Sequence, residues 1–101
     1  MALNLNRIIS HNADVAKAYN SAGDTAYPFR VVMYAMKRNE TRAIVHMISP
    51  RYASFSPAFD FASALADAGF AALPDAMTVA VEHWTGQDWD MHNVLTNDPT
   101  I

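Results

Sequence analysis

The sequence predicts a single α+β domain, in which a four-stranded antiparallel sheet packs against two helices in two layers, in the order α-β-β-α-β-β. Three observations predict it. The chain has 101 residues, enough for one core but too few for two. Its composition is 51% apolar and 17% charged, as in globular rather than disordered proteins. Hydrophobic patterns of the helical and the β type also alternate along it.

The first half predicts one helix and one hairpin. Over residues 4–20, apolar residues recur at the three- and four-residue spacing of an amphipathic helix, and Gly23 follows its end. β-forming residues then occupy 29–37 and 41–49, on either side of a turn at 39–40. Both faces of this hairpin are apolar, so it is either covered on two sides by its own chain or offers one side to a partner or a second copy.

The second half predicts a helix and a second hairpin. Ser56 and Pro57 mark the helix start, because serine caps free amide groups and proline at the first position loses no needed hydrogen bond. The helix is expected to continue to about Ala68 and to end at Gly69. Two strands follow, at 77–84 and 89–95, and residues 96–101 are expected to form a flexible tail.

Charge is divided unequally along the chain. The first 51 residues carry all seven lysines and arginines against three carboxylates, a sum of +4, whereas the remaining fifty carry seven carboxylates and no cation. The net charge of −3 weighs against direct nucleic-acid binding, and the cationic cluster Lys37, Arg38 and Arg42 is better explained as a solvated hairpin tip. Carboxylates without counter-ions in their own half remain in water or meet a basic partner.

Several classes of function are excluded or left without support. Cysteine is absent, which rules out disulfides, zinc–thiolate sites and a thiol nucleophile. We find no signal-peptide pattern and no apolar run near the roughly 20 residues of a membrane span, so we expect a cytoplasmic protein without a membrane partner. There is no nucleophile-elbow or phosphate-loop motif either, so we expect no cofactor and no enzymatic activity.

One metal site can be formulated from the second hairpin. If its loop is at residues 86–87, His83 lies opposite Asp90, and His92 lies beside them, opposite Val81. Imidazole and carboxylate groups are ligands of zinc and related cations. A small metal-dependent hydrolase around these three residues is therefore one alternative. A solvated His–Asp pair on the hairpin surface is the other, and we prefer it.

The same hairpin is the best candidate for binding a partner. In this register Trp84 faces Trp89, and exposed aromatic residues surrounded by carboxylates attract and hold basic partners. The tryptophans are slightly better explained as ordinary core, which still leaves the carboxylates outside. We expect these carboxylates to share one outer surface. The candidate partner-binding residues are Asp60, Asp67, Asp75, Glu82, Asp88, Asp90, Trp84 and Trp89.

In general build, the chain resembles small inhibitor proteins of phages and mobile elements of the anti-CRISPR type. The acidic residues of the second half, in a short α+β domain without a cofactor motif, carry this likeness. Some such inhibitors present carboxylates to the nucleic-acid-binding groove of a host complex. The resemblance implies that role here, in the host cytoplasm if the chain is phage-encoded, although the cationic cluster departs from a purely acidic mimic.

We therefore expect a non-enzymatic binding protein that occupies a basic surface of a protein partner and acts as an inhibitor. Besides the metal-dependent hydrolase, a structural or regulatory homodimer assembled through the apolar strand faces is the other alternative.

Overall fold

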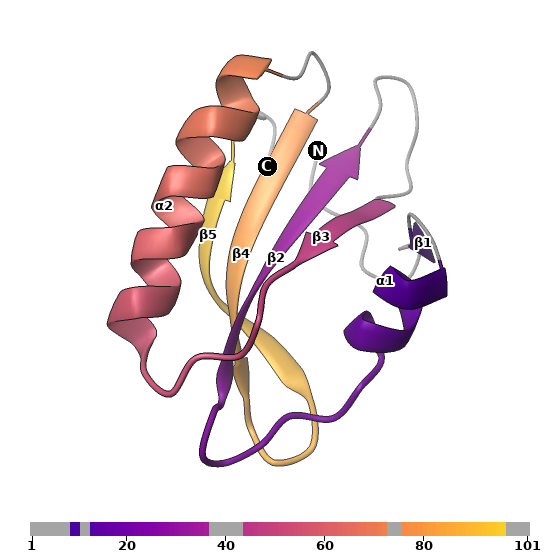
Figure 1. Ribbon diagram of the computed structural model, residues 1–101, viewed down its shortest axis with the longest axis vertical. Coiled ribbons are helices and arrows are strands. Elements are labelled where there is room, and N and C mark those ends of the chain that lie inside the picture. The colour runs from indigo at the N-terminus through magenta and orange to yellow at the C-terminus, as the bar shows by residue number, and fades with distance from the viewer. Residues whose placement is uncertain (1–8, 11–12, 37–43, 73–75, 97–101) are drawn as a thin grey trace.

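The computed structural model describes residues 9–10, 13–36, 44–72 and 76–96 (Figure 1). It confirms the predicted α+β class and the predicted order of helices and hairpins, to which a short strand before the first helix is added. The strands form one open sheet in the order β1-β3-β2-β4-β5, antiparallel except for the β1–β3 pair. No helix among the described residues is long and apolar enough to cross a membrane. The elements are β1 (Ile9–Ser10), α1 (Ala13–Tyr19), β2 (Phe29–Met36), β3 (Ile44–Ile48), α2 (Phe55–Ala72), β4 (Ala76–Trp84) and β5 (Trp89–Thr96).

The centre of the sheet is the long antiparallel pair β2–β4, which runs from Phe29 opposite His83 to Met36 opposite Ala76. Side chains on both faces of this pair are buried. One face packs against α2. On the other face, side chains of α1 pack on the strands, next to Val45 and Ile48 of β3 and Met91 of β5, so the two helices lie on opposite faces of the sheet. The apolar faces predicted for the first hairpin are thus covered to a large extent within one chain. The homodimer through the apolar strand faces stays a prediction.

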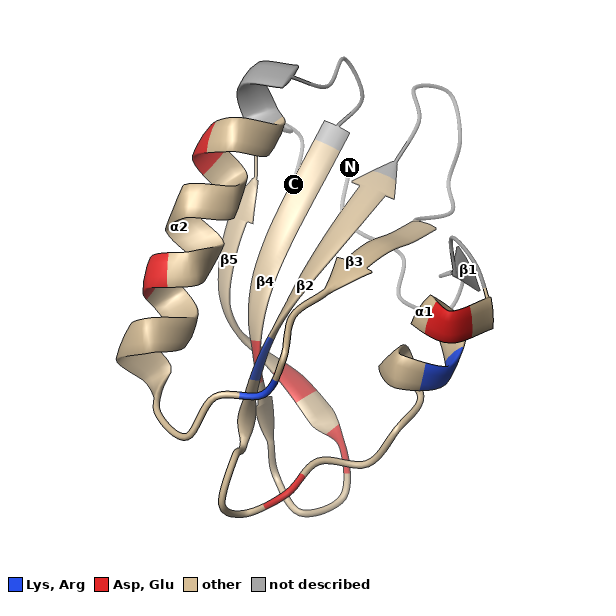
Figure 2. Ribbon diagram, viewed as in Figure 1, with Lys and Arg blue, Asp and Glu red and all other residues tan. Residues whose placement is uncertain are grey.

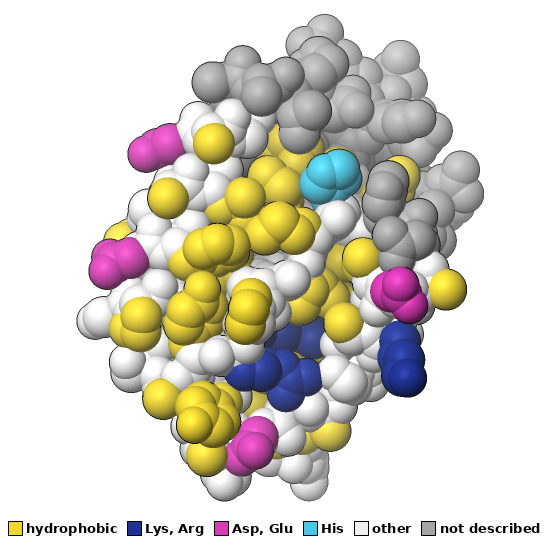
Figure 3. All heavy atoms as spheres, viewed as in Figure 1, with side chains coloured by type: hydrophobic (Ala, Val, Ile, Leu, Met, Phe, Trp, Pro, Cys, Tyr) yellow, Lys and Arg dark blue, Asp and Glu magenta, His cyan; other side chains and the backbone are white. Residues whose placement is uncertain are grey.

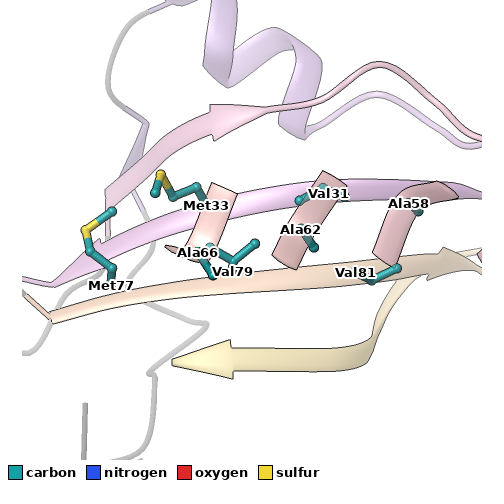
Figure 4. Packing of buried hydrophobic residues seen from close by; sticks show 8 residues of the cluster. All are labelled: Val31, Met33, Ala58, Ala62, Ala66, Met77, Val79 and Val81. Atoms are coloured by element: carbon teal, nitrogen blue, oxygen red, sulfur yellow. The ribbon is translucent and has the colours of Figure 1, made fainter. Parts of the chain in front are cut away.

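Small side chains bring α2 close to the sheet. Ala58, Ala62 and Ala66, four residues apart, are at most 3% exposed and lie against β2 and β4 (Figure 4). Gly69 continues this stripe, and a Cβ atom there would lie 2.5 Å from Cε of Met33. The prediction that Gly69 ends the helix is therefore wrong. The glycine permits close packing, and the helix continues to Ala72.

The N-terminal prediction needs a larger correction. Instead of one helix over residues 4–20, Ile9 and Ser10 form a short strand beside β3, and the helix spans only Ala13–Tyr19. Without β1, strand β3 would be an edge strand with unpaired backbone N–H and C=O groups, and pairing with β1 satisfies some of them. Local helical periodicity does not reveal this pairing. Residues 4–8 and 11–12 of the expected helix lie outside the described residues.

The second hairpin confirms the predicted pairs of Trp84 with Trp89 and His83 with Asp90. Met91 faces Glu82 in the same register, which then shifts between Glu82 and Val81, so that Asn93 faces Val81. His92 is the extra residue of this bulge, and its predicted place opposite Val81 is wrong. Strand β5 includes Thr96, so only residues 97–101 of the expected tail lie beyond it. Those residues, the turn at 39–40 and the cationic cluster at 37–42 lie outside the described residues.

Candidate binding site at the end of the second hairpin

The predicted partner-binding carboxylates do not share one surface. Asp60 and Asp67 are exposed on α2, whereas Asp88 and Asp90 are exposed in the β4–β5 hairpin. Figure 2 shows that the acidic positions of α2 and those of the hairpin lie on separate parts of the molecule, and Figure 3 shows acidic side chains at the outer margin of α2. Asp75 lies outside the described residues. We refer to Asp60, Asp67, Asp88 and Asp90 as the exposed carboxylates.

Glu82 is not part of that set, because it is buried. Its side chain is 3% exposed, and the facing side chain of Arg30 is 2% exposed. The β2–β4 register places the two residues directly opposite each other, and Nε and Nη2 of Arg30 each lie 2.8 Å from Oε1 of Glu82. The prediction that Glu82 binds a partner is therefore wrong. A carboxylate on a buried strand face requires a counter-ion from its own chain.

The second oxygen of Glu82 is also satisfied. The hydroxyl of Tyr34 donates a hydrogen bond to Oε2 of Glu82, with an oxygen–oxygen distance of 2.5 Å, and it lies 3.3 Å from the hydroxyl of Tyr19. Burial, and next the negative charge of Glu82, raise the pKa of Tyr34 far above its ordinary value. Tyr34 therefore remains a protonated donor at any physiological pH.

The guanidinium group of Arg30 lies between two aromatic rings. Its central carbon is 4.9 Å from the ring centroid of Tyr19 and 4.2 Å from that of Trp89. Nη1 of Arg30 also donates to the backbone oxygen of Tyr19 at 3.0 Å, at the C-terminal end of α1. The buried charge is thus held by a carboxylate, a helix-end carbonyl and two aromatic faces at once.

Arg51 extends this arrangement on the surface. Its guanidinium carbon is 4.8 Å from the ring centroid of Trp89, and its nitrogens donate to Oγ of Ser21 and to the backbone oxygen of Ala22. Nε1 of Trp89 in turn donates to the backbone oxygen of Ser21 at 3.0 Å. Partial burial, and then the nearby charge of Arg30, lower the pKa of Arg51 from its ordinary value. These bonds fasten the segment after α1 to the second hairpin.

A pocket of about 370 Å³ opens beside this arrangement, and we call it the hairpin pocket. Its walls are the α1 end at residues 19–22, Arg30 of β2, and the residues Trp84, Gln87, Asp88 and Trp89 of the second hairpin. The backbone at Gly23 approaches Trp84 so closely that an added Cβ would lie 2.2 Å from Cγ of the ring. The sequence singled out the tryptophans, but not the segment that packs on them.

The proposed metal ligands are not arranged around a common point. The ring centroids of His83 and His92 are 6.1 Å apart, and each ring packs against a phenylalanine: His83 against Phe29 and His92 against Phe55. Among the residues that the structure describes, no group of three His, Cys, Asp or Glu side chains could hold a metal ion. The alternative of a metal site at His83, Asp90 and His92 therefore has no support in the described structure, and the bulge removes the expected register at His92.

Comparison of the chain with family models, with curated proteins and with solved structures found no match.

Proposed function

We propose that the protein is a non-enzymatic binding protein that docks on a basic surface of a protein partner through its exposed carboxylates. The supporting observation is the distribution of counter-ions. Within the described part of the chain, the ion pair of Arg30 with Glu82 is the only salt bridge, and it is buried. The exposed carboxylates therefore have no salt-bridge partner among the described residues and remain available to a cation from outside.

The charge balance of the described residues favours the same proposal. They carry seven carboxylates and three cationic side chains, Lys17, Arg30 and Arg51, which gives −4. Arg30 is directed at Glu82 and the end of α1, and Arg51 is bonded to the segment after α1. The outer side of α2 and the hairpin end are consequently negative, and such a field accelerates encounter with basic partners.

A nucleic-acid-binding complex is the class of partner that fits best. Such complexes must expose lysine and arginine to bind phosphate, so their grooves are basic by function. We extend the proposal to inhibition: the protein competes with nucleic acid for that groove. Because the exposed carboxylates lie on two elements, α2 and the hairpin, they would neutralise more than one point of the groove.

The test is quantitative capture of binding proteins from the native host on the immobilised protein, analysed by mass spectrometry. The variants are Asp60→Lys, Asp67→Lys, Asp88→Lys and Asp90→Lys, each measured singly. Asp14→Lys is the matched control, since it changes the net charge equally at an exposed position on α1. Circular dichroism confirms that each variant is folded.

We expect a basic protein that is retained by the wild type and by the Asp14 variant, is released by added nucleic acid, and is captured less well by the other four variants. Equal capture by all five variants would contradict the proposal.

A further inference from the structure

The walls of the hairpin pocket suit one kind of chemical group. Three of its lining residues, Tyr19, Trp84 and Trp89, are aromatic. Two guanidinium groups of the chain already contact these walls: Arg30 lies between Tyr19 and Trp89, and Arg51 lies over Trp89. The planar, weakly hydrated guanidinium group stacks on aromatic rings better than an ammonium group does. The pocket is thus lined by aromatic rings, and two of them, Tyr19 and Trp89, already bind guanidinium groups of this same protein.

The polar groups left for a ligand include acceptors and one free carboxylate. Arg30 directs its donors to Glu82 and to the carbonyl of Tyr19, so its charge is balanced inside the domain. Within the described residues, the side chains of Gln87 and Asp88 make no hydrogen bond, and both line the pocket. A cation therefore finds the unpaired carboxylate of Asp88 at the pocket.

We infer that the hairpin pocket receives an arginine side chain of the protein partner, whose guanidinium group packs against Trp84 and forms a charge-assisted hydrogen bond with Asp88. The inference rests on the proposed function, and it names the group that the partner must supply. Docking through carboxylates alone requires only a basic field, but an occupied pocket requires an arginine at a defined position. The pocket would then fix the orientation of the partner, while the carboxylates of α2 mainly accelerate encounter.

The direct probe is Nα-acetyl-L-argininamide, titrated into the full-length protein. Its matched control is Nα-acetyl-L-citrullinamide, which has almost the same shape but no charge. Intrinsic fluorescence is the readout, because the only two tryptophans of the chain, Trp84 and Trp89, both line the pocket. We expect a saturable change with a Kd of about 1–10 mM for the arginine probe, as befits a small ligand. The citrulline probe should bind at least about fivefold more weakly.

Two isosteric variants locate the site. Asp88→Asn should weaken binding of the arginine probe by about two- to fivefold, as expected for a partly solvated ion pair. Asp60→Asn removes an equally exposed carboxylate from α2, outside the pocket, and should leave the affinity unchanged. Equal affinity for the two probes, an unaffected Asp88→Asn variant, tighter binding of inorganic phosphate, or no saturable change up to about 100 mM would each overturn the inference.

The outcomes also separate this inference from the proposed function. If the arginine probe fails to bind but charge reversal at Asp60 and Asp67 still reduces partner capture, the pocket is refuted and docking stands. If the probe binds as expected but all charge-reversal variants capture the partner equally, docking through the exposed carboxylates is refuted instead.

Discussion

Replacement of Arg30 with methionine tests how the buried charge of Glu82 is held. The wild-type carboxylate is 3% exposed; Arg30 binds one of its oxygens and Tyr34 binds the other. The variant keeps a long apolar side chain at position 30 but leaves the carboxylate with one donor and no counter-ion. Removal of one partner from a buried pair costs about 3–5 kcal/mol. That is a large part of the roughly 5–15 kcal/mol that stabilises a domain of this size.

The double variant Arg30→Met, Glu82→Leu distinguishes the pair from its surroundings. Apolar side chains in place of both charges remove the desolvation cost of each, so we expect a free energy of unfolding within about 2 kcal/mol of the wild type. The assay is urea unfolding followed by the fluorescence of the two tryptophans, with Glu82→Leu as the reciprocal single variant. If each single variant cost less than about 1 kcal/mol and the costs added in the double variant, the reasoning would be refuted.

Three further predictions concern the two faces of the sheet. Tyr34 keeps its proton when folded but ionises near 10.0 when unfolded, so wild-type stability should fall above pH 10, by up to about 1.4 kcal/mol per pH unit. Urea unfolding from pH 8 to 11 should show a shallower fall for Tyr34→Phe, and equal slopes would contradict the buried contact with Glu82. Gly23→Ala should lower stability by about 1–3 kcal/mol and shift tryptophan emission, because the new methyl group overlaps Trp84. Gly69→Ala should change stability by less than about 1 kcal/mol, because only the end of a flexible side chain must move and alanine favours the helix. Equal effects at the two glycines would contradict this packing.

The elements that were predicted correctly are those with strong local patterns. Ser56 and Pro57 placed the start of α2 to within one or two residues, and the loop at Gly86 fixed the pairing of Trp84 with Trp89. Errors occurred where non-local contacts decide the conformation. From the sequence, Gly69 is expected to end the helix, but its close approach to Met33 of β2 makes it a position of close helix–sheet packing.

The burial of Glu82 could not be predicted from its own hairpin. Glu82 lies on the same strand face as Ala80 and Trp84, two residues away on either side. Arg30 likewise shares a face of its own strand with Val32. Each pattern places a charge among apolar residues. Only the pairing of β2 with β4, two strands from different hairpins, brings these charges together. The hairpin pocket was missed for a similar reason, because the segment at residues 19–23 reaches the tryptophans through tertiary contacts alone.

The most direct test of the central claim, that the exposed carboxylates bring this protein to a basic partner, is the association rate of the captured partner as a function of salt. The wild-type rate should fall steeply from about 50 to 500 mM ionic strength, because screening shortens the reach of surface charge. The variant with all four exposed carboxylates changed to lysine should associate slowly, and added salt should no longer slow its association. Identical rates and salt dependence for the two proteins would contradict the account.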